Sequence, residues 1–250
     1  MIAGIIPARY ASSRFPGKSL LDIGGKTMIQ RVYEQAKKSK SLQKLVVATD
    51  DQRILDHVLS FGGEAVMTSP EHPSGTDRCW DAFPQLKEAY QYVINIQGDE
   101  PFIDPSQIDT LSALLQDGTT ELATLMIPVS KAEDLFDTGE VKIVLNDKME
   151  ALYFSRMAIP YLKGVEQAFW HEHHAYYRHV GMYAYRSDVL KKITKLPVSS
   201  LERAESLEQL RWLENGYRIK CGVTHFESHC IDTPEDVEKV MKWMGKTHFE

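Results

Sequence analysis

IIPARYASSRFPGK (residues 5–18) is the stretch that decides the fold, because it joins a buried strand to a polar loop. The apolar run Ile2–Ile6 predicts a short strand that ends at Pro7. The loop behind it carries three cations, two hydroxyl side chains and a Pro-Gly turn. Ligands of open α/β sheets bind where strands end. Such a loop can offer backbone N–H groups and positive charge to phosphates. A solvated basic turn is the alternative interpretation.

Two common phosphate-binding motifs do not describe this loop. Gly17-Lys18-Ser19 and Gly25-Lys26-Thr27 both resemble the end of a P-loop. That motif needs a glycine five residues before the Gly-Lys pair, and Ser12 and Leu20 stand there. No Gly-x-Gly-x-x-Gly follows a predicted strand, so the dinucleotide fingerprint is missing as well. The loop is therefore not that of a common ATPase or dehydrogenase.

Composition limits the class of protein. The chain has 250 residues, of which 43% are hydrophobic and 26% charged, which predicts a globular protein with a real core. The net charge of −6 argues against broad binding to nucleic acid or to membrane surfaces. No run of apolar residues approaches the length of a membrane span, and no export leader is expected. Three cysteines without a CxxC pair predict reduced thiols in the cytoplasm.

Buried runs and amphipathic stretches alternate along the first half of the chain. Residues 44–49, 64–67 and 92–96 predict further strands, with helices between them. Asp50-Asp51 is expected to cap one of these helices. This alternation predicts a parallel sheet with right-handed crossovers. Residues 141–154 then predict a hairpin around a polar turn, so the sheet stops being purely parallel there.

Polar groups follow two of the predicted strands. PSGTDR (residues 73–78) runs into a helix, and a helix N-terminus suits a phosphate or a base edge. A plain capped helix is the alternative. Asp99 and Glu100 follow the strand over 92–96, where a pair of carboxylates suits a hard divalent cation such as Mg²⁺. An ordinary acidic turn would look the same.

The second half offers weaker signals. Residues 163–177 predict an irregular polar loop, and its HEHH run lacks the spacing of a zinc protease. The strand over 179–185 places His179, Tyr183 and Tyr185 on one face, as a sugar-binding wall or as an amphipathic interface. Residues 201–211 predict one helix.

Capping signals occur inside this predicted helix and before the last helix. Ser206 and Gln209 stand at capping-box spacing. Thr233 is expected to cap the last helix.

The order of these motifs resembles the 3-deoxy-manno-octulosonate (KDO) cytidylyltransferase family, also called CMP-KDO synthetases. The matching stretches are residues 7–18, 74–78, 97–101, 153–156, 179–185 and 201–211. The resemblance implies an α/β fold of the nucleotide-diphospho-sugar transferase type: a Rossmann-like, mostly parallel sheet flanked by helices, with a smaller antiparallel hairpin and dimerisation region. It implies one domain over 1–250, with nucleotide binding mainly in 1–130 and sugar binding and dimerisation mainly in 131–230.

The resemblance also implies roles for particular residues. Arg9, Lys18 and Asp99 would be catalytic, and Mg²⁺ would be held by Asp99 and Asp232. CTP would be bound by Ala8, Arg9, Ser12, Lys18, Arg78 and Gln97. The sugar acid would be bound by Arg156, His179, Tyr183, Glu208 and Gln209.

The implied reaction moves CMP from CTP to the anomeric hydroxyl of KDO and releases pyrophosphate, in the cytoplasm, for lipopolysaccharide biosynthesis. A homodimer is implied too. The same reaction on 8-amino-KDO, or on another sugar acid such as sialic acid, stays open. Two other classes remain: a nucleotide-sugar glycosyltransferase, whose usual Asp-x-Asp is missing at residues 98–100, and a non-catalytic nucleotide-binding regulator.

Overall fold

The structure, a computed structural model, describes residues 1–11, 15–227, 230–231 and 233–244. Its internal contacts divide the chain into two compact units. The first unit is Met1–Asp109 with Glu227–Glu250, and the second is Thr110–Phe226. No helix in the described residues is both long enough and apolar enough to cross a membrane.

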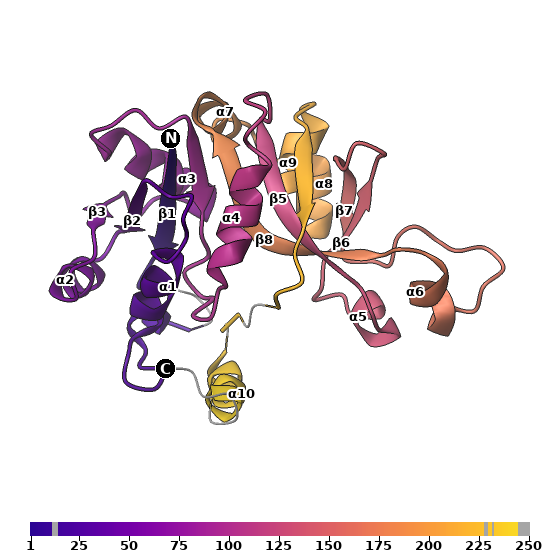
Figure 1. The fold of residues 1–250 in the computed structure, drawn as a ribbon, viewed down its shortest axis with the longest axis horizontal. Helices are drawn as coiled ribbons and strands as arrows, with labels where there is room; N and C mark the ends of the chain where they lie inside the picture. Colours follow the sequence, from indigo (N-terminus) through magenta and orange to yellow (C-terminus); the bar gives the residue numbers. More distant parts are fainter. Residues whose placement is uncertain (12–14, 228–229, 232, 245–250) are drawn as a thin grey trace. The chain divides into compact units, whose positions relative to one another are not determined.

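The first unit is built on a parallel sheet in the order β3-β2-β1-β4, of which Figure 1 labels β3, β2 and β1. Its strands are β1 (Ile2–Ala8), β2 (Lys44–Thr49), β3 (Ala65–Met67) and β4 (Tyr92–Asn95). The parallel sheet predicted from the alternation of elements is therefore confirmed in this unit. Nearly every residue of β1, β2 and β4 is buried, as expected for strands covered on both faces.

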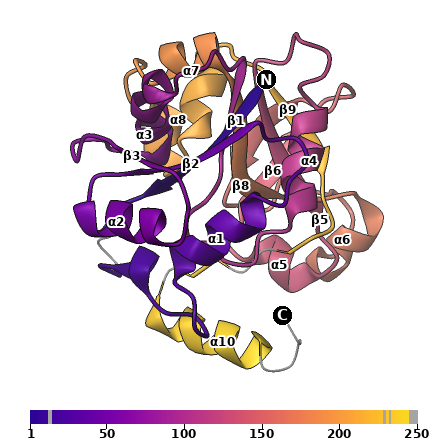
Figure 2. The same ribbon diagram turned by 60° about the vertical axis from the view of Figure 1, so that its left-hand side comes forward.

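Helices cover both faces of this sheet (Figure 2). The helix α1 (Met28–Ala36) contacts β1 and β2, and α2 (Gln52–Ser60) contacts β2 and β3. The helix α3 (Gly75–Ala82) contacts β1, β2 and β4. The strand order reverses between β3 and β4, so right-handed crossovers place α3 on the face opposite α1 and α2. The short helices η1 (Lys18–Leu20) and η2 (Phe83–Gln85) and the helix α4 (Pro105–Ala113) complete residues 1–113.

Strand β1 runs further than the sequence predicted. It continues through Pro7 to Ala8, because β2 pairs with it as far as Ala8 and Thr49. Strand β4 pairs with β1 only as far as Ile5. Beyond that point β1 has β2 as its paired neighbour, and an edge position of this kind tolerates Pro7, which has no N–H to donate. The loop that follows therefore begins at Arg9 rather than at Pro7.

The end of the chain returns to the first unit. Helix α10 (Pro234–Met244) lies after Ile231, and both Ile231 and Val240 pack in a cluster with Ile23, Met28 and Phe102. Thr233 donates its N–H and its hydroxyl to the Asp236 carboxylate in the first turn of α10, which fits its predicted place at the helix start.

The second unit contains a mixed sheet. Strand β5 (Leu122–Pro128) pairs antiparallel with β8 (Tyr177–Arg186) and parallel with β9 (Ile219–Val223). The predicted hairpin is confirmed as β6 (Lys142–Leu145) and β7 (Ala151–Ser155), and β6 also pairs with β8. The mostly parallel sheet with an antiparallel part, predicted as the fold class, is thus observed.

Short helices complete this unit. They are α5 (Ala132–Phe136), η3 (Gln167–Phe169), α6 (Trp170–His173), α7 (Ser187–Ile193), α8 (Ser200–Glu205) and α9 (Gln209–Glu214). The prediction of an irregular polar loop over 163–177 was incomplete, because Trp170 anchors η3 and α6 in an apolar cluster with Leu135 and Tyr176. Buried aromatic surface supplies the order that the polar sequence did not indicate.

The single helix predicted over 201–211 was wrong. Helix α8 ends at Ser206, whose φ of 54° lies in the left-handed region, and α9 begins again at Gln209. The capping box is formed by Ser199 and Glu202 at the start of α8 rather than by Ser206 and Gln209. The left-handed backbone at Ser206 interrupts the helical hydrogen bonds. Serine seldom adopts this conformation, so the sequence did not predict the break.

Candidate active site

One cavity of about 220 Å³ lies in the first unit, where β1 and β4 end and α3 begins. Six of the residues predicted for CTP or for catalysis line it: Ala8, Arg9, Lys18, Arg78, Gln97 and Asp99. The remaining lining residues are Pro7, Ser19, His72, Pro73, Ser74, Gly75 and Gly98. Two predicted residues, Ser12 and Asp232, lie outside the residues that the structure describes.

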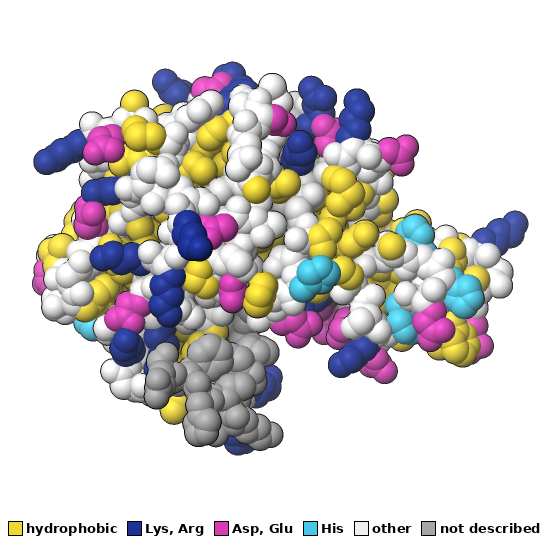
Figure 3. All heavy atoms as spheres, in the orientation of Figure 1, with side chains coloured by type: hydrophobic (Ala, Val, Ile, Leu, Met, Phe, Trp, Pro, Cys, Tyr) yellow, Lys and Arg dark blue, Asp and Glu magenta, His cyan; other side chains and the backbone are white. Residues whose placement is uncertain are grey.

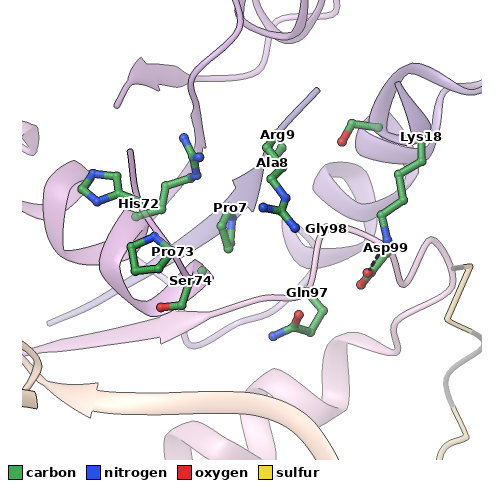
Figure 4. A pocket seen from close by; sticks show the side chains of 13 residues that line it. Pro7, Ala8, Arg9, Lys18, His72, Pro73, Ser74, Gln97, Gly98 and Asp99 are labelled. Carbon is green, nitrogen blue, oxygen red and sulfur yellow. Dashed lines mark hydrogen bonds and ion pairs between the residues drawn. The ribbon is translucent and has the colours of Figure 1, made fainter. Parts of the chain in front are cut away.

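The lining of this cavity carries more positive than negative charge. Arg9, Lys18 and Arg78 are its cations, and Asp99 is the only carboxylate among the lining residues that the structure describes. Figure 4 shows Lys18 and Asp99 on one side, His72, Pro73 and Ser74 on the other, and Arg9 between them. A polyanion therefore meets an excess of cations here.

The lysine and the aspartate form an ion pair. Lys18 Nζ lies 2.7 Å from Asp99 Oδ2, and their side chains are 16% and 23% exposed. Lys18 Nζ also donates to the carbonyl oxygen of Ile231 at 3.4 Å. The N–H of Ile231 in turn donates to the carbonyl of Asp99 at 3.0 Å. Lys18, Asp99 and the segment just before residue 232 are thus joined at one point.

Two glycines let the backbone segments of the site approach closely. A Cβ on Gly98 would lie 2.7 Å from the carbonyl oxygen of Pro7, a distance that real Cβ atoms do not show. Gly17, just before Lys18, has φ of 76°, and a Cβ there would meet the ring of Tyr10 at 3.2 Å. Glycine is needed at both places, because any side chain would push the strand end or the loop away.

The start of helix α3 forms the other end of the cavity. Ser74 is its N-cap, accepting from Asp77 N at 3.2 Å and donating to the carboxylate of Asp77 at 2.6 Å. The N–H of Arg78 donates to the carbonyl of Ser74, so both residues belong to the same turn. The prediction that residues 73–78 run into a helix is confirmed.

Arg78 is held by two residues that the sequence did not single out. Its guanidinium is buried and donates from one nitrogen to Thr68 Oγ1 at 2.6 Å and from another to Asp50 Oδ2 at 2.8 Å. The sequence suggested that Asp50 helps to cap α2, but in the structure this carboxylate binds Arg78 instead. Asp51 alone caps that helix, by accepting from the N–H of Arg53.

His72 was missed as well. Its Nε2 lies 2.7 Å from Asp81 Oδ2, and the N–H of Ser69 donates to the same oxygen at 2.8 Å. The hydrogen bond to His72 is the main reason why the pKa of Asp81 is lowered. The pair ties the loop before α3 to the helix itself. No spacing in the sequence indicates which carboxylate this histidine meets.

The residues predicted to bind the sugar acid all lie in the second unit. His179, Tyr183 and Tyr185 are consecutive in a row of ring contacts, with centroids 5.2 and 6.1 Å apart, so the predicted aromatic face of β8 is confirmed. Trp212 packs edge-on against Tyr183 at 5.0 Å. A wall of aromatic rings therefore lies along this strand.

Two members of this wall carry unusual protonation behaviour. Burial lowers the pKa of His179 to about 3 and raises the pKa of Tyr183 well above its ordinary value, so both are neutral at pH 7. The Thr124 hydroxyl can donate to the carbonyls of Val180 and Met182 and lies 3.0 Å from His179 Nε2. Nε2 therefore donates to Thr124, and Nδ1 is an acceptor.

The Tyr183 phenol has a further property. Its oxygen is buried, and among the described residues it has no hydrogen-bond partner. Burying a hydroxyl without a partner costs free energy, so such a group favours a ligand that can complete the bond.

Arg156 is fixed to the end of α8. Its N–H donates to the Glu205 carboxylate at 3.0 Å and its Nε to the Glu205 carbonyl at 2.8 Å, while Ser155 Oγ donates to the same carboxylate at 2.7 Å. Glu205 thus positions the strand end that carries Arg156, a role the sequence did not reveal. Of the two residues of α9 and its N-cap that were predicted to bind the sugar, Gln209 is buried and Glu208 is half-buried.

Comparison with known proteins relates the chain to one family. A family model described as "Cytidylyltransferase" matches residues 3–219. A protein of Parabacteroides distasonis named 3-deoxy-manno-octulosonate cytidylyltransferase is 55% identical over 97% of both chains. A Shewanella piezotolerans protein named 8-amino-3,8-dideoxy-manno-octulosonate cytidylyltransferase is 47% identical over 93% of this chain and 94% of its own.

A solved structure gives the same relationship. The structure titled CMP:2-keto-3-deoxy-manno-octonic acid synthetase complexed with CTP superposes with a TM-score of 0.90 at 43% identity, covering 98% of each chain. Full-length similarity of this size in both sequence and fold identifies the family. The chain belongs to the cytidylyltransferases and, among them, to the 3-deoxy-manno-octulosonate cytidylyltransferase family.

Proposed function

We propose that this protein transfers CMP from CTP to the anomeric hydroxyl of KDO, giving CMP-KDO and pyrophosphate. The names of its relatives support the reaction. The observation that carries the proposal is the cavity of the first unit, where Arg9, Lys18, Arg78 and Asp99 converge from three separate segments of the chain. The product is an activated sugar acid of the kind consumed in lipopolysaccharide biosynthesis, and we place the reaction in the cytoplasm.

The positions of the lining residues indicate how CTP would be oriented in the cavity. The triphosphate would lie at the side of Lys18 and Asp99, since an ammonium group and a metal-binding carboxylate are what phosphates need. The cytosine would lie at the side of His72, Ser74 and Arg78, with Gln97 as a further polar contact. Ala8 and Ser12, before and within the loop, would supply the remaining contacts to the nucleotide.

The described part of the site fits Mg²⁺. Asp99 Oδ2 and the Ile231 carbonyl already surround a positive nitrogen, that of Lys18, at 2.7 and 3.4 Å. Oxygen donors of this kind are the ligands that Mg²⁺ prefers. No group of three or more His, Cys, Asp or Glu side chains that could hold a metal occurs in the described residues, and Asp232, the proposed second ligand, is outside them. When bound, the ion would supply positive charge to the triphosphate and lower the pKa of the attacking hydroxyl.

The chain's own groups act by position and charge. The anomeric oxygen of the sugar attacks the α-phosphorus in line, the bond to the β-phosphate oxygen breaks, and the hydroxyl proton is lost to solvent. Pyrophosphate leaves with the electron pair of that bond, so no covalent enzyme intermediate is needed. Arg9 and Lys18 stabilise the negative charge that grows on the leaving pyrophosphate, which is how most catalysis of phosphoryl transfer is achieved.

The sugar acid would meet the aromatic wall of β8. The unpartnered phenol of Tyr183 can donate to a sugar hydroxyl, and His179 Nδ1 can accept from another. The guanidinium N–H groups of Arg156 that neither Glu205 nor the Thr138 carbonyl holds can bind the carboxylate of the substrate. Glu208 and Gln209, at the start of α9, would bind further hydroxyls. The relatives that act on 8-amino-KDO make that sugar the alternative substrate.

The second unit also supports a homodimer. Leu152, Met157, Tyr161 and Phe169 are between 46% and 73% exposed, although they are large and apolar. Figure 3 shows hydrophobic side chains among the histidines of the α6 end of this unit. Tyr161 packs on Trp170, the residue after Phe169, and exposed apolar patches of this kind commonly mark interfaces between proteins. We propose that residues 1–130 mainly bind the nucleotide and that residues 131–230 mainly bind the sugar and form the dimer.

A pyrophosphate-release assay tests the proposal. CTP with Mg²⁺ is offered together with KDO, 8-amino-KDO or sialic acid in separate reactions, and each kcat/KM is measured. We expect release with KDO and a lower rate with the other two. A higher rate with 8-amino-KDO would assign that sugar instead. CTP binding without pyrophosphate release from any of them would indicate the regulator, and no CTP binding would exclude the cytidylyltransferase reaction.

A further inference from the structure

The guanidinium of Arg78 is fixed by the ends of two neighbouring strands. Strands β2 and β3 are paired up to Thr49 and Met67, so Asp50 and Thr68 are the next residues at the same edge of the sheet. The N–H of Thr68 donates to the carbonyl of Thr49 at 2.8 Å and holds the two ends together. From there Thr68 and Asp50 accept from two different nitrogens of Arg78, at 2.6 and 2.8 Å.

These contacts leave Arg78 little freedom. Its side chain is 4% exposed and that of Asp50 is 13% exposed, so the ion pair is shielded from water. An arginine side chain has several rotatable bonds, but two hydrogen bonds to separate strand ends determine the plane of the guanidinium. Of the three residues only Arg78 lines the cavity, whereas Asp50 and Thr68 stand behind it. They can influence a ligand only through Arg78.

The chemistry of pyrimidines gives this arrangement a use. A guanidinium is permanently charged and can only donate. Cytosine offers two adjacent acceptors, N3 and O2, whereas uracil carries a hydrogen on N3. A mobile arginine could avoid that hydrogen and donate to a carbonyl of uracil instead. A fixed one cannot, and an N–H facing another N–H is a buried polar group without a partner.

We propose that Asp50, with Thr68, positions Arg78 so that it distinguishes CTP from UTP. Asp50 is a positioning residue and does not touch the nucleotide. The proposal rests on the proposed function, because it takes the cavity to be the CTP site. It assigns the choice of base to a carboxylate that follows β2, outside the motifs that carry the family resemblance.

The test is the ratio of kcat/KM for CTP to kcat/KM for UTP, measured by pyrophosphate release from the full-length protein. In Asp50→Asn, the side chain keeps its size but loses the charge that fixes Arg78. We expect KM for CTP to rise about tenfold with kcat changed less than about threefold. We expect kcat/KM for UTP to change little, so that the CTP/UTP ratio falls by about tenfold. If Asp50 only stabilised the fold, the substitution would lower kcat/KM for CTP and for UTP by the same factor.

Two further variants keep the test decisive. Thr68→Val removes the hydrogen bond from Arg78 to an uncharged hydroxyl and keeps the ion pair, so the ratio should fall in the same direction by about threefold, even if Asp50→Asn does not fold. Asp109→Asn is the matched control. That carboxylate is also part-buried and accepts from Ser39 and Ser41, but it does not line the cavity or contact Arg78. Its CTP/UTP ratio should equal that of the wild type.

The outcomes separate this proposal from the one it rests on. If the wild type releases pyrophosphate from CTP but uses UTP equally well, the proposed function stands and the role of Asp50 is overturned. The same holds if Thr68→Val and every folded Asp50→Asn preparation keep the wild-type ratio. If the wild type releases no pyrophosphate from CTP with any sugar acid, both proposals fall.

Discussion

Replacing Lys18 by methionine should separate catalysis from stability. The side chain keeps its length and apolar stem but loses the ammonium that lies 2.7 Å from Asp99 Oδ2. At an effective dielectric constant near 20, two charges at this distance attract by about 6 kcal/mol. Most of that attraction is offset by the loss of hydration, and both groups keep some contact with water. The net contribution of the pair to folding should therefore be about 1 kcal/mol.

The catalytic loss should be much larger. Loss of one preorganised charge contact to the triphosphate costs about 10²–10³ in kcat, or about 2.7–4 kcal/mol. The melting temperature should fall by only about 2–4 °C in a chain of this size. Pyrophosphate release at saturating CTP measures the first quantity, and a thermal unfolding curve measures the second. The two numbers together show whether Lys18 acts on the substrate or only on the fold.

Lys26→Met is the control for this experiment. Lys26 forms an ion pair with Glu34 at 2.6 Å, but its side chain is 47% exposed and does not line the cavity. This variant should keep wild-type kcat. The reasoning is refuted if Lys18→Met retains more than about a third of the wild-type kcat. It is also refuted if the activity is lost together with a fall in melting temperature of about 10 °C or more.

Four other changes have defined outcomes. Asp99→Asn should lower kcat at least about 10²-fold in Mg²⁺, and near-normal activity would remove Asp99 from the metal site. Gly98→Ala should abolish CTP-induced stabilisation in a thermal shift assay, because its Cβ would lie 2.7 Å from the Pro7 carbonyl. The pKa of His179 is lowered to about 3 in the folded protein. Between pH 7 and pH 5 a proton therefore binds this histidine in the unfolded chain but not in the folded one. The free energy of unfolding should fall by about 1–2 kcal/mol over that range. Urea unfolding of His179→Asn should lack this part of the pH dependence. Met157→Asp should yield monomers by light scattering if the exposed apolar side chains of the second unit form a dimer interface, and an unchanged mass would argue against that interface.

The elements of the first unit were predictable because local signals agree with the tertiary structure. β-branched runs became buried strands, and Asp51 and Ser74 cap the helices that follow them. The residues that line the cavity follow the ends of strands in one parallel sheet, and such ends meet at one edge. The prediction that Asp50 caps α2 was wrong, because a carboxylate that follows a strand can accept a hydrogen bond from the next helix or from a distant arginine.

Long-range contacts explain most other misses. Ser206 adopts φ of 54° although its neighbours favour a helix, and the preceding Glu205 is occupied by Ser155 and Arg156. His72 meets Asp81 across the start of α3. None of these partners is fixed by spacing, because each is chosen by how separate segments pack. Local patterns therefore predict elements and their order better than they predict what a polar side chain touches.

The return of the chain end to the first unit has a consequence for synthesis on the ribosome. Ile231 joins the cluster of Ile23 and Met28 and bonds to the backbone of Asp99, yet the whole second unit is translated between Asp99 and Ile231. Domains usually fold as they emerge, in order from the amino terminus. Here the cluster of Ile23, Met28 and Phe102 stays incomplete until Ile231 has left the exit tunnel. A nascent chain in which Ile231 has not yet left the tunnel should therefore lack the contact between Lys18 and the Ile231 carbonyl.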